Sequence, residues 1–522
     1  SDEYAKEHVT PIIRQNKKYK KIYKKYIKNY SFLRLTLDEK EDLICIKKIV
    51  NYYKPNIFFT LKDIIKLYHK HPKIFKANSK IKRDEGSRLS TGQKFWKRAK
   101  KSIAGGNMFL SKNPEMFLPN FWPTYYNKAK GCNIWDLDNK KLTDFALMGV
   151  GTNILGYARN EIDIEVKKAI EKSNMSSLNC PEDVFLAEKL LELHPWADKA
   201  KFARTGGEAN AMAIRIARTY SKKENIAVCG YHGWHDWYLA ANLNKEDDLK
   251  THLLPGLGTK GVLKKLKNTV FTFMFNDLKK LEKLIKNDDI GVIIMEVSRN
   301  YLPENDFLKK VRDLANKNKI VLIFDECSSG FRETFGGIHL KYDVNPDICM
   351  FGKALGNGYA ITSIIGKRKI MDKASDSFIS STFWSERIGY VAGCKTLETM
   401  KKEKSWEYIS KLGKELKKNW TDLGKKYELP IEINGIDALP SFYIKSKKFL
   451  EYKTFISQEM LKQNYLCSTA VYISTAHNRK ILKDYIKKID KVFLKIKECE
   501  DGKSIKKLLD GPVCRSQFKR LN

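Results

Sequence analysis

Several features that would fix a compartment or a metal site are missing from this chain. It has no apolar run long enough to span a bilayer, and its first residues lack the charged and apolar regions of a secretion signal. Its ten cysteines include no Cys-x-x-Cys pair, and only Cys229 lies close in sequence to His232 and His235. A zinc site and a disulfide framework are therefore both disfavoured. We expect a cytoplasmic protein without a membrane partner or a bound metal.

Acidic residues are scarce relative to basic ones. Lys and Arg total 98 against 61 Asp and Glu, which gives a formal net charge of +37. Such a charge can attract polyanions or a membrane surface. However, the chain has no nucleic-acid motif and no repeat of basic and aromatic residues, and its lysines are spread over the whole length. The pattern favours a lysine-rich composition without a nucleic-acid partner, and a field that attracts small anionic substrates.

The length and the apolar pattern predict several domains. With 522 residues, of which 42% are hydrophobic, the chain exceeds one ordinary core. After residue 151, helical patterns alternate with short apolar strands, which is typical of an α/β domain with a mostly parallel sheet. The expected helices are 161–173, 184–193 and 207–222, the expected strands are 226–229, 292–297, 321–325 and 347–351, and a β-hairpin turning at Asp138-Asn139 is expected within 125–144. We divide the chain into a helical stretch at 1–86, an arm at 87–150, the large α/β domain at 151–400 and a smaller α+β domain at 401–522.

Two motifs of the large predicted domain have the composition of a ligand site. Thr205-Gly206-Gly207 opens a segment with helical apolar spacing, and the free N–H groups and dipole of a helix start bind phosphate. A glycine pair at such a place is more often only a tight turn. Tyr231-His232 follows the strand ending at Cys229, where an aromatic ring either stacks on a flat cofactor or packs into the core. Neither motif decides a function alone.

A carboxylate and a lysine follow two further strands. Asp325 closes the apolar strand 321–325, and the ligand crevice of a parallel sheet lies at such carboxyl ends. A carboxylate there can keep a pyridine nitrogen protonated, or it can merely cap a helix or form an ion pair. Lys353 follows strand 347–351 directly after Gly352. A partly desolvated lysine can act as an amine nucleophile, although most lysines of so basic a chain are solvated.

In this order, the four features resemble class III of the fold-type I enzymes that depend on pyridoxal 5'-phosphate (PLP), and in particular the glutamate-1-semialdehyde 2,1-aminomutase-like proteins. The resemblance covers about residues 104–522, and it implies a large mostly parallel sheet domain, a smaller α+β domain, PLP as cofactor and a homodimer. By this resemblance, Lys353 forms the Schiff base with PLP and transfers the protons, and Asp325 pairs with the pyridine nitrogen. Gly206 and Gly207 bind the phosphate, Tyr231 stacks on the ring, and Thr382 contacts the phosphate of the neighbouring subunit. The resemblance also places Thr205, His232 and Glu296 in the cofactor site.

The chain also departs from the family pattern. Val297 stands where the family usually has Pro, and Cys327 stands where an apolar β-branched residue backs the ring. These variants resemble a subgroup found with bacterial surface-polysaccharide genes. The resemblance implies transfer of an amino group from a small amine donor to a small, anionic aldehyde or keto compound destined for a surface glycan. An intramolecular 2,1-aminomutase is the main alternative. A catalytically silent interaction protein is a third possibility, which the joint presence of Lys353 and Asp325 disfavours.

The first 86 residues carry a second resemblance. Glu7–Pro11, Arg34–Glu39 and Glu41–Leu43 are similar to the closing part of cytidylyltransferases of the spore-coat-polysaccharide type. The Gly-rich nucleotide loop of such enzymes is missing and the chain begins at Ser1, so the resemblance implies the C-terminal part of a longer bifunctional protein, with its boundary at Lys80–Gly86. An ordinary helical extension is the alternative. The expected buried helix faces are Leu43, Ile44, Ile46, Ile49 and Val50 on one helix, and Leu61, Ile64, Ile65 and Leu67 on another.

Overall fold

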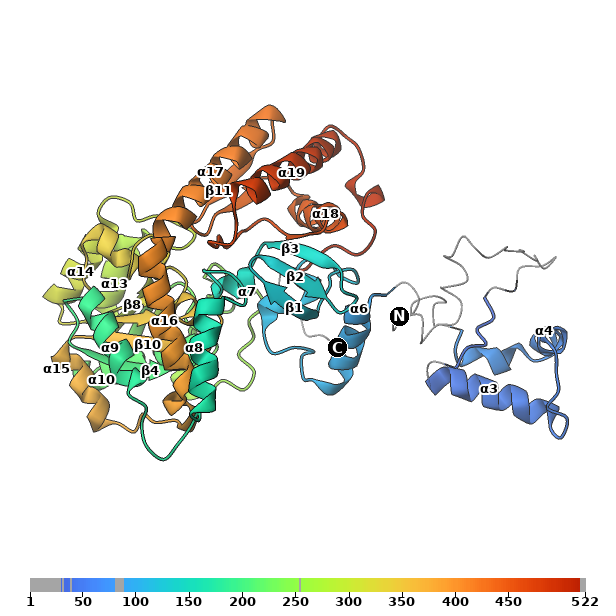
Figure 1. Cartoon of the computed structure of the whole chain (residues 1–522), viewed down its shortest axis with the longest axis horizontal. Helices are drawn as coiled ribbons and strands as arrows, with labels where there is room; N and C mark the ends of the chain where they lie inside the picture. Colours follow the sequence, from blue (N-terminus) through green and yellow to red (C-terminus); the bar gives the residue numbers. More distant parts are fainter. Residues whose placement is uncertain (1–29, 31, 38–39, 80–88, 253–254, 517–522) are drawn as a thin grey trace. The chain divides into compact units, whose positions relative to one another are not determined.

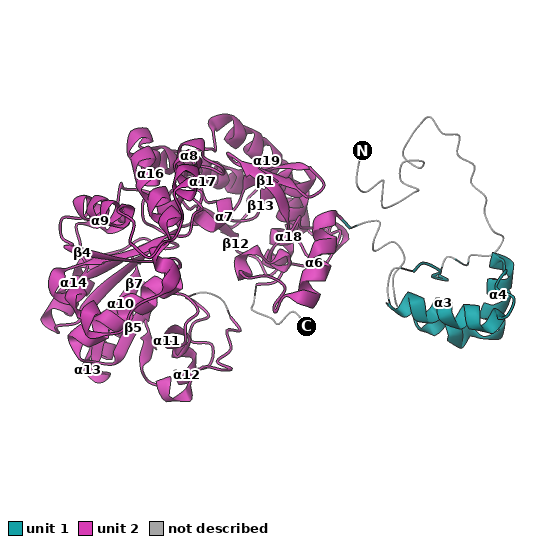
Figure 2. Cartoon of the chain, turned by 60° about the horizontal axis from the view of Figure 1, so that its bottom comes forward, with its two compact units in different colours: residues 1–89 teal, residues 90–522 magenta. Residues whose placement is uncertain are grey.

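The computed structural model describes residues 30, 32–37, 40–79, 89–252 and 255–516, and divides the chain into two compact units, 1–89 and 90–522 (Figure 2). The predicted boundary at Lys80–Gly86, the motif Glu7–Pro11 and Asp38 lie outside the described residues.

The first unit contains helices α3 (Lys40–Tyr53) and α4 (Leu61–Lys70) and the 3-10 helix η1 (Pro72–Lys76). The two helices fall where the sequence places them, but the expected buried face of α3 is partly wrong, because Leu43 and Ile44 are 41% and 47% exposed. The face that is buried carries Asp42, Cys45 and Ile49. Asp42 faces inward because the Arg34 guanidinium donates two hydrogen bonds of 2.8 Å to its carboxylate. This buried ion pair rotates the helix relative to its apolar pattern.

The second unit is built on a seven-stranded sheet with the order β4-β10-β9-β8-β7-β5-β6. Figure 1 labels β4, β8 and β10 of this sheet. Only β10 runs antiparallel to its neighbours, so the sheet is mostly parallel, as predicted. The strands are β4 (Lys199–Ala203), β5 (Asn225–Cys229), β6 (Val270–Thr272), β7 (Ile290–Glu296), β8 (Val321–Glu326), β9 (Ile348–Phe351) and β10 (Thr362–Gly366).

Helices cover both faces of this sheet, because side chains that alternate along each strand enter two separate cores. In β7, Ile293 and Met295 belong to one core, and Val292 and Ile294 belong to the other. The first core also includes side chains of α8 (Asn160–Glu171), α9 (Glu182–Leu193), α13 (Leu278–Asn287), α14 (Phe307–Lys317) and α16 (Arg387–Glu403). The second includes side chains of α10 (Gly206–Ser221), α11 (Asp236–Leu239), α12 (Ala241–Asn244) and α15 (Arg368–Met371).

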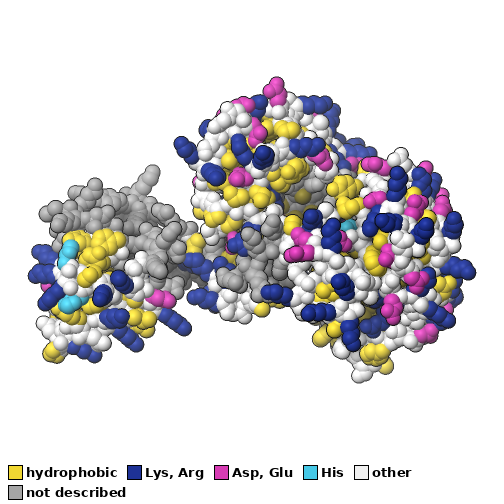
Figure 3. Space-filling model, turned by 180° about the vertical axis from the view of Figure 1, so that it is seen from behind, with side chains coloured by type: hydrophobic (Ala, Val, Ile, Leu, Met, Phe, Trp, Pro, Cys, Tyr) yellow, Lys and Arg dark blue, Asp and Glu magenta, His cyan; other side chains and the backbone are white. Residues whose placement is uncertain are grey.

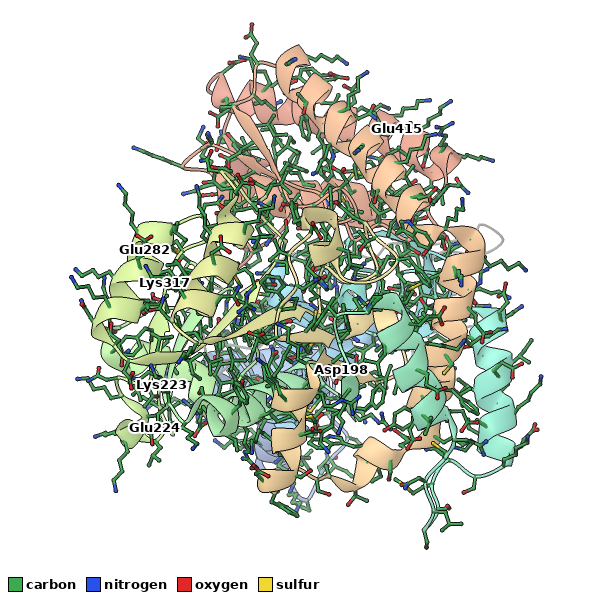
Figure 4. All side chains as sticks on the ribbon, turned by 90° about the vertical axis from the view of Figure 1, so that its left-hand side faces the viewer. Asp198, Lys223, Glu224, Glu282, Lys317 and Glu415 are labelled. Carbon is green, nitrogen blue, oxygen red and sulfur yellow. The ribbon has the colours of Figure 1, made fainter. Side chains whose placement is uncertain are left out.

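The outer faces of α13 and α14 carry charged side chains. In Figure 4, Glu282 of α13 and Lys317 of α14 point away from the sheet, while Leu281 of α13 is fully buried. Lys and Arg are scattered over the visible face of both units, among Asp and Glu and apolar side chains (Figure 3). The positive charge on this face is therefore spread, in agreement with the distribution of lysine along the sequence.

A smaller layered region completes the second unit. Its four-stranded sheet has the order β1-β2-β3-β13, and β13, from near the end of the chain, pairs in parallel with β3. The predicted hairpin at Asp138-Asn139 is the β2–β3 connection, and β1 adds a second hairpin in front of it. The elements are α6 (Thr91–Ser102), β1 (Tyr126–Lys130), β2 (Asn133–Asp136), β3 (Lys141–Phe145), α7 (Met148–Gly151), α17 (Ser405–Lys426), β11 (Ile431–Asn434), β12 (Ser441–Ile444), α18 (Phe449–Lys462), β13 (Tyr465–Cys467) and α19 (Arg479–Glu500).

The short 3-10 helices of the second unit are η2 (Leu110–Lys112), η3 (Pro114–Met116), η4 (Lys264–Leu266), η5 (Ile338–Tyr342), η6 (Lys353–Gly356), η7 (Asp372–Asp376), η8 (Thr382–Ser385) and η9 (Ile505–Lys507). Within the described residues, none of the helices has the length and apolar character needed to cross a membrane.

Candidate active site

The carboxyl ends of β7, β8 and β9 bring the predicted polar residues to one edge of the large sheet. Glu296 ends β7 and pairs in register with Asp325 of β8. Lys353 lies two residues beyond the end of β9, as the first residue of η6, and its backbone φ of 40° is in the left-handed region. Its Nζ donates a 2.6 Å hydrogen bond to Oγ of the buried Ser328. The lysine amine therefore lies inside the edge of the sheet and not on the outer surface.

Gly352 allows this close packing. A Cβ at Gly352 would lie 2.9 Å from Sγ of Cys327 and 3.0 Å from Cγ2 of Thr362. Cys327 also lies beside Gly206, where a Cβ would meet the same sulfur at 3.2 Å. Burial raises the pKa of the Cys327 thiol to about 11, although the charge of Lys353 acts to lower it. The thiol is thus neutral near pH 7 and acts as a small apolar surface between two backbone segments.

Asp325 is held by three hydrogen bonds and is 3% exposed. Its Oδ2 accepts from the Asn210 amide at 2.8 Å and lies 2.8 Å from Nδ1 of His232, and its Oδ1 accepts from the Cys327 backbone at 3.0 Å. The other ring nitrogen of His232, Nε2, lies 3.1 Å from the Cys229 carbonyl. Both nitrogens of His232 are engaged, so this residue orients the carboxylate of Asp325.

The predicted glycine turn is the start of α10, with Thr205 as its N-cap. The Glu208 carboxylate accepts hydrogen bonds from the backbone N–H of Thr205 at 2.8 Å and from its hydroxyl at 2.9 Å. Burial acts to raise the pKa of Glu208, but the hydrogen bonds from Thr205 and Trp384 bring it below its usual value. The next N–H groups, of Gly206 and Gly207, have no partner within the helix. The helix start therefore offers two free donors.

Close packing around Gly207 shapes this helix start into a cradle. A Cβ at Gly207 would lie 2.8 Å from the His235 ring, and a Cβ at Gly233 would lie 3.0 Å from the Gly207 Cα. Nδ1 of His235 is buried here and has no hydrogen-bond partner in the described part of the chain. An unsatisfied buried ring nitrogen beside free backbone donors is what a bound phosphate would satisfy.

Tyr231 and Glu296 are also brought to this edge. The Tyr231 backbone N–H donates a 3.1 Å hydrogen bond to Oε2 of Glu296. Burial, reinforced by the nearby Cys327 and Asp325, raises the pKa of the Tyr231 phenol. Thr382, by contrast, is exposed at the start of η8, whereas Trp384 of the same segment donates a 3.2 Å hydrogen bond to Glu208. The structure therefore brings together all the predicted site residues except Thr382.

One group of side chains with metal-ligand chemistry lies beneath the site. Glu326, His339 and Cys349 place their ligand atoms within 4.8 Å of one another and are buried. His339 Nδ1 contacts Glu326 at 2.6 Å, and its Nε2 accepts a 3.1 Å hydrogen bond from Trp196. The imidazole has no free nitrogen, so this group is a hydrogen-bonded core network.

The sequence alone did not single out Asn210 and Ser328. Asn210 lies one helical turn after Gly206 and so shares the face of α10 that meets Asp325. The helical spacing between Gly206 and Asn210 could therefore have identified Asn210 from the sequence. Ser328 has no comparable signal, because only the turn after β8 brings its hydroxyl to Lys353.

The family model named aminotransferase class-III matches residues 119–484, well over half of the chain. The chain belongs to the class III aminotransferases. A 3-aminobutyryl-CoA aminotransferase of Cloacimonas acidaminovorans (strain Evry) is 32% identical over 374 residues, which cover 70% of this chain and 85% of that protein. A glutamate-1-semialdehyde 2,1-aminomutase of Sulfurisphaera tokodaii is 31% identical over 361 residues, which cover 67% of this chain and 84% of that protein.

Solved structures confirm the predicted fold. FumI of Sphingopyxis sp. MTA144, solved with PLP, has a TM-score of 0.72 at 22% identity, and an omega-transaminase from Sphaerobacter thermophilus has a TM-score of 0.70 at 21% identity. Each likeness covers 80% of this chain and all of the other. The class III aminotransferase described here thus has the fold of the PLP-dependent transaminases.

PLP is the cofactor of this family and of this chain. The site fits it in two places that the geometry alone reveals. The start of α10 has free N–H groups, no Cβ in the way and an unsatisfied His235 nitrogen, which suit the phosphate. The carboxylate of Asp325, fixed by Asn210, suits a protonated ring nitrogen.

Proposed function

We propose that this class III aminotransferase moves an amino group from a small amine donor to a small, anionic aldehyde or keto compound, with Lys353 as the covalent anchor of PLP. The observation that carries the proposal is the placement of the Lys353 amine, 2.6 Å from Ser328, at the sheet edge that also holds Asp325 and the start of α10. The general attraction of anions by a net charge of +37 supports the anionic acceptor.

Each residue has one task in this proposal. When bound, PLP withdraws electrons from the carbon that bears the amine. Lys353, displaced from PLP by the incoming amine, would move a proton between that carbon and the C4′ carbon of the cofactor, so one base would serve both halves of the reaction. Asp325 keeps the ring nitrogen protonated, because Asn210 and His232 hold the carboxylate in place.

The remaining residues hold the cofactor. Gly206 and Gly207 donate their N–H groups to the phosphate, beside Thr205, whose hydroxyl is taken by Glu208. Tyr231 lies against the flat ring, and Glu296 fixes the Tyr231 backbone. Ser328 aligns the Lys353 amine.

The test is a screen of amine donors against the PLP-loaded protein. Each donor is mixed with the protein in the absence of a carbonyl compound, and the absorbance of the cofactor is followed. At least one small amine is expected to convert the cofactor fully to its amino form. If a broad panel of amines leaves the spectrum unchanged, external donors are not used and the proposal fails.

An intramolecular 2,1-aminomutase is the second candidate, because relatives of about 30% identity carry that name. A mutase with the same groups would start from the amino form of the cofactor and would need no external donor. With a ¹⁵N-labelled amino aldehyde and an excess of unlabelled donor, a mutase moves the label to the neighbouring carbon and takes no nitrogen from the donor, whereas a transferase adds an unlabelled nitrogen from the donor to the aldehyde carbon.

We propose that the protein is a homodimer in which Thr382 reaches the phosphate site of the neighbouring subunit. Large apolar side chains near this segment are exposed in the single chain: Phe383 at 66%, Trp234 at 71% and Phe378 at 84%. Exposed apolar side chains in such number favour an isologous interface. Sedimentation that gives an active monomer at high dilution would contradict this.

All ten cysteines are free thiols, which supports a cytoplasmic location.

For the first unit we propose a link to cytidylyltransferases, within a bifunctional protein that makes a surface-glycan precursor. The support is the position of the Arg34–Asp42 pair inside the motif that resembles those enzymes, and the separate small core of this unit. This unit alone should not bind CTP, since it lacks the Gly-rich nucleotide loop. The upstream reading frame tests the fusion directly, because a stop codon directly before Ser1, with only a start codon between them, would reject it.

A further inference from the structure

Arg299 lies three residues beyond the end of β7 and is not used by the proposed chemistry. Its Nη2 lies 3.3 Å from Oε2 of Glu296, which is longer than the 2.7–2.9 Å typical of a charge-assisted hydrogen bond. Its Nε is buried and has no hydrogen-bond partner in the described part of the chain. The guanidinium thus has donors that the described structure leaves unused.

Arg332, a second buried arginine of this region, is bound structurally through two of its three nitrogens, and only its Nη1 has no partner in the described part of the chain. Arg332 is fully buried, and its Nε donates to the Ser328 carbonyl at 2.5 Å while its Nη2 donates to the Gly151 carbonyl. The Arg299 side chain is different, because it is 22% exposed and its one polar contact within the described residues is the loose pair with Glu296. An arginine with a free fork of donors at the edge of an active site is suited to a planar anion.

The surroundings hold Arg299 in place and keep it charged. The Ile436 and Gly435 N–H groups donate to the carbonyls of Arg299 and Asn300 at 3.0 and 2.9 Å. Burial opposes the charged form, but Glu296 and other nearby groups, including Asp325, raise the pKa of Arg299 above its usual value. The side chain therefore stays cationic and is attached to a fixed backbone.

Arg299 also lines a small cavity next to the cofactor-binding edge. The other lining residues include Gly230, Thr251, His252, Met274 and Tyr301. Its volume is about 50 Å³, several times the 10–15 Å³ that one water needs but far less than a whole ligand. The cavity suits a group of a few atoms at one end of a substrate.

We infer that Arg299 is a specificity-determining residue that binds the carboxylate of the amine substrate at this cavity. This rests on the proposed function, because it assigns one end of the molecule whose amine reacts near Lys353. The incoming carboxylate accepts hydrogen bonds from the unused N–H groups of Arg299, while Glu296 keeps its hydrogen bond from the Tyr231 backbone N–H. An amine of the same length without a carboxylate gains nothing at this residue.

The experiment compares Arg299→Met and Arg299→Lys with Arg479→Met in the PLP-loaded protein. Arg479 is 65% exposed at the start of α19 and does not line the cavity, so its replacement removes the same charge at a different place. Single-turnover spectra are recorded with 3-aminobutyrate and with 2-aminopentane, which has a similar shape but lacks the carboxylate. Binding of butyrate and of butanamide, which lack an amine to react, is measured by calorimetry.

Arg299→Met should weaken binding of butyrate and 3-aminobutyrate on the order of 10–100-fold, the range of hydrogen bonds to charged groups. Its kinetics with 2-aminopentane should change less than about twofold, and Arg299→Lys should fall between, because lysine keeps the charge without the fork. Arg479→Met should match the wild type throughout.

Equal butyrate affinity for Arg299→Met and Arg479→Met would overturn the inference. The inference would also fail if Arg299→Met slowed the reactions of 3-aminobutyrate and 2-aminopentane by the same factor. If the wild type converts no amine at all, the proposed function fails, and the calorimetric comparison still decides whether Arg299 binds a carboxylate.

Discussion

Acidification should destabilise the second unit through His477, which clamps the last part of the chain to β3. This side chain is fully buried. Its Nε2 lies 2.8 Å from the Asp144 carbonyl, and its Nδ1 accepts a 3.2 Å hydrogen bond from the Ser474 backbone. The ring is therefore neutral, with its proton on Nε2. Burial lowers the pKa of His477 from 6.5 to about 4, although the bond to Asp144 acts in the opposite direction.

The sign and size of the effect follow from this pKa. Between pH 6.5 and 4 the unfolded chain binds a proton at His477 that the folded chain does not, so the free energy of unfolding falls as the pH falls through this window. At about 1.4 kcal/mol per pH unit, the full loss is about 3 kcal/mol. His194 and His252 have pKa values lowered to about 4 by burial as well. A loss of this size is a large part of the 5–15 kcal/mol that is typical of folded proteins.

Urea unfolding at pH 7 and pH 5 of the wild type and His477→Gln isolates the contribution. Glutamine can donate to the Asp144 carbonyl but cannot take up a proton in this range. Between the two pH values, the variant should lose about 2 kcal/mol less stability than the wild type. If the two proteins lose the same amount, His477 is not held neutral in the folded state and the reasoning is wrong.

Two further predictions concern the cofactor site. Asp325→Asn should still bind PLP but lose turnover on the order of 10²-fold or more, because a neutral amide cannot stabilise the protonated ring nitrogen; steady-state kinetics within a few-fold of the wild type would refute this role. Gly207→Ala should fold but bind PLP more weakly, because its Cβ would lie 2.8 Å from the His235 ring at the proposed phosphate cradle; fluorescence titration of PLP measures this, and unchanged affinity would place the phosphate elsewhere.

The sequence was most informative where pattern and chemistry coincide. β7, β8 and β9 are buried on both faces, so their continuous apolar runs predicted the parallel sheet and the edge that holds Asp325 and Lys353. The buried face of α3 was mispredicted, because the decisive partner of Asp42 is Arg34, in a separate segment before the helix. Ser328 and Arg299 could not be chosen from the sequence, because their importance depends on distances that only the folded turns after β8 and β7 create.

The central claim is that Lys353, among the 98 Lys and Arg residues of the chain, is the one that carries PLP. Borohydride reduction of the PLP-loaded protein, followed by peptide mass spectrometry, tests it most directly. We predict one stable phosphopyridoxyl group, on the peptide that contains Lys353, and none on folded Lys353→Ala treated in the same way. A stoichiometric label on another lysine, or one that persists in Lys353→Ala, would contradict the account.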